Sequence, residues 1–393
     1  CNFDDNKTPE DTGFPLKICL VNSYYPPWIG GAETYLSNVA KGLKERGHQV
    51  TVYCSERPLR AGERFENGIR VVRMRTPFRV YSTPITVIPT SLLTERYDVI
   101  HANFPGPYLA AVSALIAKAT GTPIVLTWHN DLPPFASVAG IIVKLHDRFS
   151  SSYLDLYTRI VSTTNVYARN SKTLRRYSEK VRVIHNGVDT TRFNPSVDGD
   201  YVKEKHGLGR SKVALFVGAL TTWHAYKGVD VLLGAFSKVC RTRKDVRLVI
   251  VGGGNLTNQY KALANEFGIS SNVVFAGEID AQELSRYYAA CDIAVLPSKD
   301  SSEGFGLVLM EAMATGKAVI GSRVGGVPEV ITDGFNGILV EPNNVEALAR
   351  AMEFLFQNDE ARVLMGRHGR MLAEQNDWST VAKKLESLYR KIL

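Results

Sequence analysis

The feature that most constrains the fold is an alternation of short apolar runs with helical segments, which repeats over the two halves of the chain. The apolar runs have the length and composition of buried strands, and they occupy residues 16–22, 49–54, 69–76, 97–103, 122–128, 158–164 and 180–186, and then 212–218, 246–254, 272–277, 292–298 and 317–322. Helical patterns separate several of them, for example AETYLSNVAKGLKERG, in which Gly47 is a typical C-terminal cap. Strands separated by helices form parallel, doubly wound sheets, so the sequence predicts an α/β protein.

A segment rich in turn-forming residues, NGVDTTRFNPSVDGD at 186–200, divides this alternation into two parts. We therefore predict a first domain over residues 1–195, with a flexible tail at 1–15, and a second domain over residues 196–376. An amphipathic helix follows at 377–393. Two open sheets that face each other form a crevice at the carboxyl ends of their strands, where sheets of this kind bind ligands.

The net charge of +8 lies entirely in the first half of the chain. Residues 1–196 contain 24 Lys and Arg against 16 Asp and Glu, whereas the remainder contains 23 of each. Eight arginines fall between Arg57 and Arg96. Two interpretations remain open: a solvated basic surface, or a surface for an anionic partner such as acidic lipid or a polyprenyl phosphate. The sequence has no helix-turn-helix, zinc-finger or RNA-recognition signature, which argues against nucleic acid.

The sequence favours a cytoplasmic protein. No apolar run approaches the roughly 18 residues of a membrane span, and the nearest, residues 132–143, contains two prolines. The polar stretch CNFDDNKTPEDTGFP lacks the apolar core of a signal peptide, although whether Cys1 is a native terminus stays open. The five cysteines are scattered without metal-ligand spacing, which fits a reducing compartment and predicts no metal site.

The stretch DSSEGFGLVLMEAMATG carries two carboxylates in contrasting surroundings. Glu311 lies in a run that is apolar on nearly every face of the helix predicted from Gly306 onward. A carboxylate there needs strong hydrogen-bond donors, which either the fold itself or the vicinal hydroxyls of a ligand can supply. Glu303 lies in a polar loop ahead of this helix. The amides of Phe305, Gly306 and Leu307 then face out of a helix N-terminus, where anions and polar oxygens bind.

Three further positions beside predicted strand ends have residue types suited to a phosphate or sugar. Gly30 and Gly31 precede a helix, as at phosphate-binding helix N-termini, although a tight turn explains them equally well. Lys227 precedes Gly228 at a predicted helix start. The helix dipole disfavours a cation there unless an anionic ligand binds; the alternative is an exposed lysine. His129 follows a buried strand at its carboxyl end, where it serves a site or is merely a hydrogen-bonded loop residue.

The glycine-rich segments Gly30-Gly31 and 251–257 lack the GxGxxG fingerprint, so no nicotinamide cofactor is predicted.

Five segments carry a combination of motifs that is more specific than any one of them. They are residues 30–33, 186–193, 217–228, 297–316 and 325–342. Together they resemble the large family of retaining GT-B glycosyltransferases (glycosyltransferase family four), which includes sucrose-phosphate synthases and phosphatidylinositol mannosyltransferases. The resemblance covers nearly the whole chain, and the pair Glu303 and Glu311 with Gly-Phe-Gly between them is its most specific part.

The resemblance implies a GT-B fold, in which two Rossmann-like domains enclose a crevice. The first domain then lies on the acceptor side and the second binds the donor, and the last helix crosses back to the first domain. The alternative for residues 377–393 is a plain terminal helix on the second domain.

The resemblance also implies roles for individual residues. Glu311 binds the ribose hydroxyls of a nucleotide sugar, and Glu303 lies against the donor sugar. Lys227 neutralises the departing diphosphate, and His129 lies near the sugar and the acceptor. The remaining donor-binding positions act through their backbone or their small size, and they are Gly30, Gly31, Gly218, Gly304, Phe305, Gly306 and Leu307.

The implied activity is metal-independent, retaining transfer of a sugar from a nucleoside-diphosphate sugar to an acceptor hydroxyl. A UDP-sugar is favoured over a GDP- or ADP-sugar, and no cofactor or metal is expected; Asp4-Asp5, the nearest approach to a metal-binding DxD motif, lies in the tail. The mechanism usually described for the family is a same-face displacement, in which Glu303 stabilises and is not a covalent nucleophile. The alternatives are a non-catalytic sugar-binding protein, and a GT-B epimerase or hydrolase.

One departure from the family pattern concerns the diphosphate. The family commonly has Gly-Arg-Leu where this chain has Gly218-Ala219-Leu220, so the usual arginine is missing. His224, in the longer loop that leads to Lys227, is a candidate substitute for the phosphate contact. The alternatives are another cation, a weaker grip on the diphosphate, or a subgroup with its own arrangement.

The acceptor is not set by these motifs. The basic first half and the apolar segment 132–143 favour a peripheral enzyme on the cytoplasmic face of a membrane, with a glycan or lipid-linked acceptor. The nucleotide base, the donor sugar, the linkage and the oligomeric state stay open.

Overall fold

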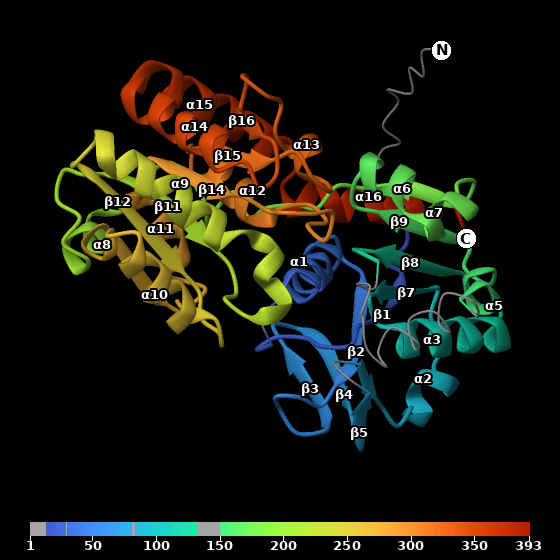
Figure 1. Ribbon diagram of the computed structural model, residues 1–393. Coiled ribbons are helices and arrows are strands. Elements are labelled where there is room, and N and C mark those ends of the chain that lie inside the picture. The colour runs from blue at the N-terminus through green and yellow to red at the C-terminus, as the bar shows by residue number, and fades with distance from the viewer. Residues whose placement is uncertain (1–12, 29, 81–82, 132–149) are drawn as a thin grey trace, which may run out of the picture.

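The computed structural model describes residues 13–28, 30–80, 83–131 and 150–393, which form two Rossmann-like α/β domains (Figure 1). The first contains an eight-stranded sheet in the order β10-β9-β8-β7-β1-β2-β4-β3, parallel throughout except for the edge strand β3. Its strands are β1 (Lys17–Val21), β2 (Gln49–Ser55), β3 (Gly62–Glu66), β4 (Ile69–Met74), β7 (Val99–Phe104), β8 (Ile124–Trp128), β9 (Arg159–Ser162) and β10 (Val181–Val183). A separate hairpin pairs β5 (Phe78–Val80) with β6 (Thr83–Ile85).

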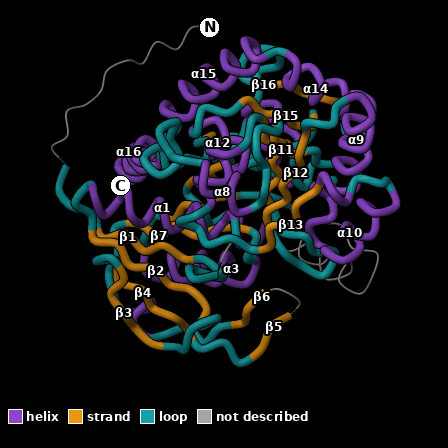
Figure 2. Tube along the Cα trace, turned by 90° about the vertical axis from the view of Figure 1, so that its left-hand side faces the viewer, coloured by secondary structure: helices purple, strands orange, loops and turns teal. Residues whose placement is uncertain are grey.

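The helices of this domain cover both faces of its sheet (Figure 2). They are α1 (Gly31–Glu45), α2 (Thr90–Thr94), α3 (Pro107–Thr120), α5 (Ser151–Leu154), α6 (Asn165–Asn170) and α7 (Lys172–Arg176). The alternation of side chains along a strand supplies two buried faces. Ile18 and Leu20 of β1 pack into the core beneath α1, whereas Cys19 and Val21 pack into the core on the side of α3.

The second domain contains a six-stranded, fully parallel sheet in the order β13-β12-β11-β14-β15-β16. Its strands are β11 (Lys212–Val217), β12 (Val246–Val251), β13 (Val273–Gly277), β14 (Ile293–Leu296), β15 (Ala318–Ser322) and β16 (Gly337–Val340). The helical elements are α8 (Asp200–Lys205), the 3-10 turn η1 (Thr222–Lys227), α9 (Val229–Thr242), α10 (Thr257–Glu266), η2 (Ser270–Asn272), α11 (Leu284–Ala290), α12 (Leu307–Ala314), α13 (Val327–Val330), α14 (Val345–Gln357) and α15 (Asp359–Gln375).

The doubly wound architecture predicted from the sequence is confirmed, and every predicted strand run overlaps a strand. Strands β3, β5, β6 and β16 were not predicted. The first of these is exposed along almost its whole length, so it lacks the apolar pattern by which a strand is recognised.

The last helix, α16 (Trp378–Arg390), crosses back to the first domain, as the resemblance implied (Figure 1). Trp378, Leu385 and Tyr389 lie in the same core as Ile18 and Leu20. The alternative of a terminal helix packed only on the second domain is therefore wrong.

The basic stretch divides into paired and exposed arginines. Arg70 forms ion pairs with Glu63 at 2.7 Å and Glu95 at 2.6 Å, and the buried Arg73 pairs with Glu66 at 3.0 Å. The other six side chains are exposed, and they are Arg57, Arg60, Arg64, Arg75, Arg79 and Arg96. Part of the positive charge thus stabilises the fold, while most of it faces solvent.

The described part of the chain contains no helix that is both long and apolar enough to cross a membrane. Its four cysteines, Cys19, Cys54, Cys240 and Cys291, are buried free thiols. The apolar segment 132–143 and most of the predicted tail, residues 1–12, lie outside the described residues.

Candidate active site

The predicted site residues gather where the carboxyl ends of the two sheets face each other. His129 directly follows β8, and Gly218 directly follows β11. A β-carbon built on Gly304 would lie 2.7 Å from the carbonyl oxygen of His129, so the two domains touch at these residues. A β-carbon on Gly31 would lie 3.9 Å from Cδ1 of Leu307. The N-terminus of α1 therefore faces the N-terminus of α12 across the crevice.

Lys227 and Glu303 form a largely buried ion pair. Lys227 Nζ lies 3.0 Å from Glu303 Oε2, and the two side chains are 14% and 9% exposed. Burial lowers the pKa of Lys227, but the charges of Glu303 and Tyr226 and the hydrogen bonds to both together outweigh burial, so this pKa lies above its ordinary value. The alternative of an exposed lysine is therefore wrong.

The surroundings of this pair hold it in place. A β-carbon on Gly218 would lie 3.0 Å from Cδ of Lys227, so the glycine leaves room for the lysine stem. Ser298 Oγ lies 3.4 Å from Glu303 Oε2. A cation and an anion are thus held together between η1 and the loop ahead of α12.

Glu311 lies on α12 with one oxygen bonded to the fold. The hydroxyl of Tyr288 donates to Oε2 at 2.7 Å, and within the described ranges this is the one hydrogen bond to the carboxylate. Burial raises the pKa of Glu311 to about 7; the Tyr288 bond and the charge of Arg192 oppose this in part. The carboxylate lines a small cavity of about 40 Å³ together with Arg192 and Asn38. Among the described residues the fold therefore supplies a single donor, Tyr288, to this carboxylate.

The loop ahead of α12 presents its backbone to the crevice. Gly306 adopts φ 85° at the start of the helix, a conformation that disfavours any side chain, and Phe305 is buried. The ring of Phe305 lies 6.3 Å from that of His185 of the first domain. Leu307 then begins α12, one residue after the start predicted at Gly306.

His129 has a fixed orientation. Its Nε2 donates to Asn103 Oδ1 at 3.1 Å, because the amide nitrogen of Asn103 is turned to the carbonyl of Val21 at 3.3 Å. The ring of Tyr35 packs edge-on against it, with the ring centres 4.8 Å apart. Burial lowers the pKa of His129 to about 4. The ring is therefore neutral at neutral pH and cannot serve there as a cation.

His224 lies on η1 together with Lys227. Its Nδ1 is 2.8 Å from Thr221 Oγ1, which leaves Nε2 for another partner. Burial, and then the charge of Lys227, lower the pKa of His224. The ring is therefore a neutral group beside Lys227, and a phosphate contact from it is a hydrogen bond rather than a charge pair.

Glu329, which no sequence pattern singles out, joins the two domains through its carboxylate. Glu329 is on α13 of the second domain, and its oxygens accept from the amides of Asn165, at 2.8 Å, and Val166, and from Nδ2 of Asn165 at 3.2 Å. His185 Nε2 lies 3.2 Å away. The segment 325–342 was recognised as a motif, but only the folded chain shows that this acid crosses the crevice.

Within the described residues no group of three or more His, Cys, Asp and Glu side chains is arranged to hold a metal ion.

Two Rossmann-like domains with polar groups at their facing strand ends define the GT-B class of glycosyltransferase. Residues 29–192 match the family model described as Glycosyltransferase Family 4, and residues 200–372 match the one described as Glycosyl transferases group 1. The chain therefore belongs to the glycosyltransferase family that these two models describe, and it is a glycosyltransferase.

Relatives support this assignment along more than nine-tenths of the chain. The O-antigen chain mannosyltransferase C of Escherichia coli is 28% identical, with 91% of this chain and 92% of that protein covered. The GDP-mannose-dependent alpha-(1-6)-phosphatidylinositol monomannoside mannosyltransferase of Mycolicibacterium smegmatis is also 28% identical, with 94% and 97% covered. Among solved structures, HepE of Anabaena in complex with UDP and glucose has a TM-score of 0.74 at 20% identity, with 95% of this chain and 99% of that chain covered. This likeness confirms the fold.

Proposed function

We propose that the enzyme transfers a sugar from a nucleoside-diphosphate sugar to an acceptor hydroxyl with retention of the anomeric configuration. The observation that carries the proposal is the buried ion pair of Lys227 and Glu303, because Glu303 lies in the loop directly ahead of α12, the helix that carries Glu311. A sugar-binding protein without catalysis needs neither a buried cation for a diphosphate nor a half-open carboxylate for a ribose.

The donor is held at three points in this proposal. The free oxygen of Glu311 accepts from the ribose hydroxyls, while Tyr288 keeps the other oxygen occupied. Lys227 and the amides at the N-terminus of α12 bind the diphosphate and neutralise its developing charge, as a metal ion does in other transferases. Glu303 and the neutral His129 lie against the sugar, near the acceptor.

The reaction step is a same-face displacement. The bond between the anomeric carbon and the diphosphate oxygen breaks, and the acceptor oxygen bonds to the same face of that carbon. The acceptor proton passes to the leaving phosphate oxygen, so no protein base is required. Glu303 is held by Lys227 and stabilises the positive charge on the sugar ring; a covalent glycosyl-Glu303 adduct in the mass spectrum would falsify this mechanism.

The nucleotide base is the least constrained part of the proposal. The sequence favours UDP; a relative with 28% identity is named GDP-mannose-dependent, and a neighbour in fold was solved with UDP. Both bases are therefore compared in the tests.

Turnover without metal tests the proposed chemistry. Donor consumption is measured in EDTA for wild type and Glu303→Gln, and proton NMR identifies the anomer formed. We expect wild-type turnover to be unchanged in EDTA and the product to keep the anomeric configuration of the donor. Turnover of the variant should be about a hundredfold slower, which corresponds to an activation free energy higher by roughly 2.7 kcal/mol. An inverted product, or loss of activity in EDTA that magnesium restores, contradicts the proposal. A donor that is consumed without transfer indicates the hydrolase alternative.

We further propose that the first domain binds an anionic membrane surface at the cytoplasmic face, where a glycan or lipid-linked acceptor is presented. Phe65 and Phe78 are 73% and 58% exposed. The exposed Arg64 precedes Phe65, and the exposed Arg79 follows Phe78. Apolar side chains flanked by cations are typical of interfacial binding.

Liposome flotation at low salt tests the membrane proposal. Arg64→Glu with Arg79→Glu should abolish co-flotation with acidic vesicles, whereas the matched change of two exposed arginines of the other domain, Arg241 and Arg350, should not. Wild type that fails to float with acidic lipid excludes the membrane proposal and leaves the transferase proposal intact.

A further inference from the structure

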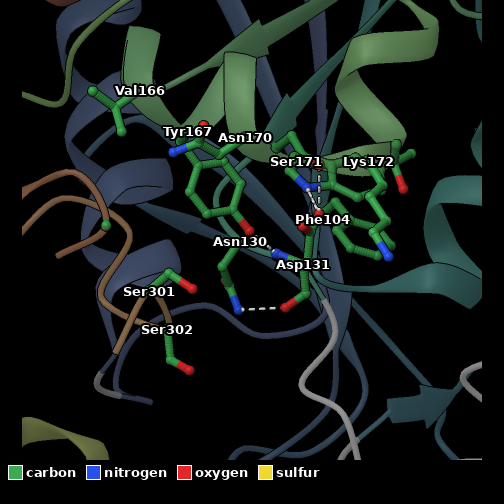
Figure 3. Close-up of a pocket in the computed structure, with 13 residues that line it drawn as sticks. Phe104, Asn130, Asp131, Val166, Tyr167, Asn170, Ser171, Lys172, Ser301 and Ser302 are labelled. Atoms are coloured by element: carbon green, nitrogen blue, oxygen red, sulfur yellow. Dashed lines mark hydrogen bonds between the residues drawn. The ribbon is translucent and has the colours of Figure 1, made fainter. Parts of the chain in front are cut away.

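A cavity of about 360 Å³ lies beside the donor crevice and is not lined by the residues assigned to the donor (Figure 3). Asn130 and Asp131 line it from the end of β8, and Tyr167 and Lys172 line it from α6 and α7. The second domain contributes Ser301 and Ser302. Asn130 follows His129 in the chain and Ser302 precedes Glu303, so the cavity adjoins the two groups that face the transferred sugar.

Asp131 is fixed within this cavity but is not saturated. Its Oδ1 accepts from Trp128 Nε1 and from Ser171 Oγ, each at 2.9 Å. Its backbone N–H donates to the hydroxyl of Tyr167. The side chain of Tyr167 also forms a hydrogen bond with this carboxylate. A carboxylate offers about four lone-pair positions, so three donors hold it rigidly and leave an oriented acceptor position for a ligand hydroxyl.

The charges around the cavity disfavour a phosphorylated ligand. Among the described residues of the lining, Lys172 is the only basic one and Asp131 the only acid, so their charges balance. Ser171, the N-cap residue of α7, donates to Asp131 and keeps its carboxylate inside the cavity. A phosphate entering here meets a negative charge where it needs donors.

The rest of the lining suits an uncharged polyhydroxyl compound. Asn130, Ser301, Ser302 and Thr173 carry side-chain amides and hydroxyls, which pair with hydroxyls as both donors and acceptors. Trp128 and Tyr167 add aromatic surface. A volume of about 360 Å³ lies at the lower end of the range for small-molecule sites, which suits a single sugar unit.

We propose that this cavity is the acceptor subsite and that it binds an uncharged sugar residue, with the carboxylate of Asp131 accepting from the hydroxyls of that sugar. The inference rests on the proposed function and narrows it: the acceptor offers a glycosyl residue to the enzyme, and any phosphate or lipid that the acceptor carries lies outside the cavity. The hydroxyl that attacks the donor belongs to this sugar, because the cavity adjoins His129 and Glu303.

Saturation-transfer NMR with methyl glycosides tests the inference on the full chain. The probes are the methyl α-glycosides of mannose, glucose and galactose, and the charged arms are mannose 6-phosphate and inorganic phosphate. Each is titrated with and without UDP or GDP. We expect at least one methyl glycoside to bind wild type, and Asp131→Asn to weaken it by about tenfold or more. The asparagine keeps Oδ1 for Trp128 and Ser171, so nucleotide affinity and thermal midpoint should stay unchanged.

Two further variants keep the test decisive if Asp131→Asn folds poorly. Ser302→Tyr fills the cavity from an exposed loop of the other domain and should abolish glycoside binding. Lys172→Ala should leave glycoside affinity within about threefold. Asp155→Asn, an exposed carboxylate of the same domain, is the matched control.

The outcomes separate this inference from the proposed function. If mannose 6-phosphate binds more tightly than the methyl glycosides and this binding depends on Lys172, the acceptor sugar is not uncharged. If no glycoside signal depends on Asp131, the cavity is not the acceptor subsite. Nucleotide binding is unaffected by either result. Asp131-dependent glycoside binding without any nucleotide binding supports the sugar site and contradicts the transferase proposal.

Discussion

The ionisation of a single residue, Glu311, sets an expected pH dependence for donor binding. Its pKa is raised to about 7 by burial, and only the ionised carboxylate accepts from both ribose hydroxyls. Nucleotide affinity should therefore rise about tenfold between pH 6 and pH 8, since the ionised fraction rises by that factor. Calorimetric titration across this range measures it, with Glu311→Gln as the variant in which this rise is absent. An affinity that falls over the same range contradicts the assignment of Glu311 to the ribose.

The same shift affects stability with a definite sign. The pKa of Glu311 in the folded state lies above the unfolded value of about 4.3, so the folded state binds a proton that the unfolded state has released. The stability gained from this proton is fully present below about pH 4.3 and is lost as the pH rises through about 7. The thermal midpoint of wild type, relative to Glu311→Gln, should fall from pH 5 to pH 8. If the thermal midpoints of wild type and Glu311→Gln change in parallel over this range, the pKa of Glu311 is not raised in the folded protein.

His224 is the residue expected to compensate for Ala219. His224 and Lys227 lie on the same short element, η1. When Thr221 donates to Nδ1 of His224, Nε2 carries the proton and can donate to a phosphate oxygen. We expect His224→Ala to weaken nucleoside-diphosphate binding by about tenfold and nucleoside binding hardly at all, since one hydrogen bond to a charged group is worth roughly 1.5 kcal/mol or more. Titration calorimetry with both ligands checks this. The control is His206→Ala, in the same domain, whose ring contacts Tyr287. An unchanged affinity of His224→Ala for the nucleoside diphosphate would exclude His224 as the replacement for the missing arginine.

At the scale of elements, α13 of one domain is joined to α6 of the other by Glu329. The amides of Asn165 and Val166 are the first of α6, so the carboxylate also satisfies the open end of that helix. Glu329→Gln removes the charge and one acceptor oxygen, and we expect kcat/KM to fall about tenfold or more while the circular dichroism stays unchanged. Small-angle scattering should show a larger radius of gyration. Glu341→Gln, an exposed carboxylate paired with Arg323, is the matched control. An unaltered radius with full activity would mean that the contact does not hold the crevice closed.

The contact of α16 with the first sheet contains a buried polar network. Tyr389 lies 2.5 Å from Nδ1 of His101, whose Nε2 lies 2.7 Å from Oγ1 of Thr127. Burial, and then the charge of His129, lower the pKa of His101 to about 3, so the network is neutral. Tyr389→Phe leaves Nδ1 unpaired and should cost about 1 to 3 kcal/mol. Denaturant unfolding measures this cost against Tyr201→Phe, an exposed tyrosine. An equal stability of both variants contradicts the role of the network in fixing α16.

At the scale of the whole molecule, the sequence predicts the sheets better than the contacts between domains. Parallel strands buried on both faces leave continuous apolar runs, which is why the runs from 16–22 to 317–322 are visible in the sequence. Glu303 and Glu311 were visible because a carboxylate beside apolar residues is unusual. Tyr288, Glu329 and Asp131 were not, since a tyrosine or an acid at a polar position has no local signal; their roles arise from partners far away in the chain.

The account depends most directly on a nucleoside-diphosphate site that contains Glu311. The decisive measurement is a metal-free thermal-shift panel of UDP, GDP, ADP and their sugars on wild type and Glu311→Ala. Ligand at about 100 times its dissociation constant adds roughly 2.7 kcal/mol, which moves the midpoint by a few degrees. We predict a shift with one base that the variant loses. No shift with any nucleotide, or an equal shift in Glu311→Ala, contradicts the central claim.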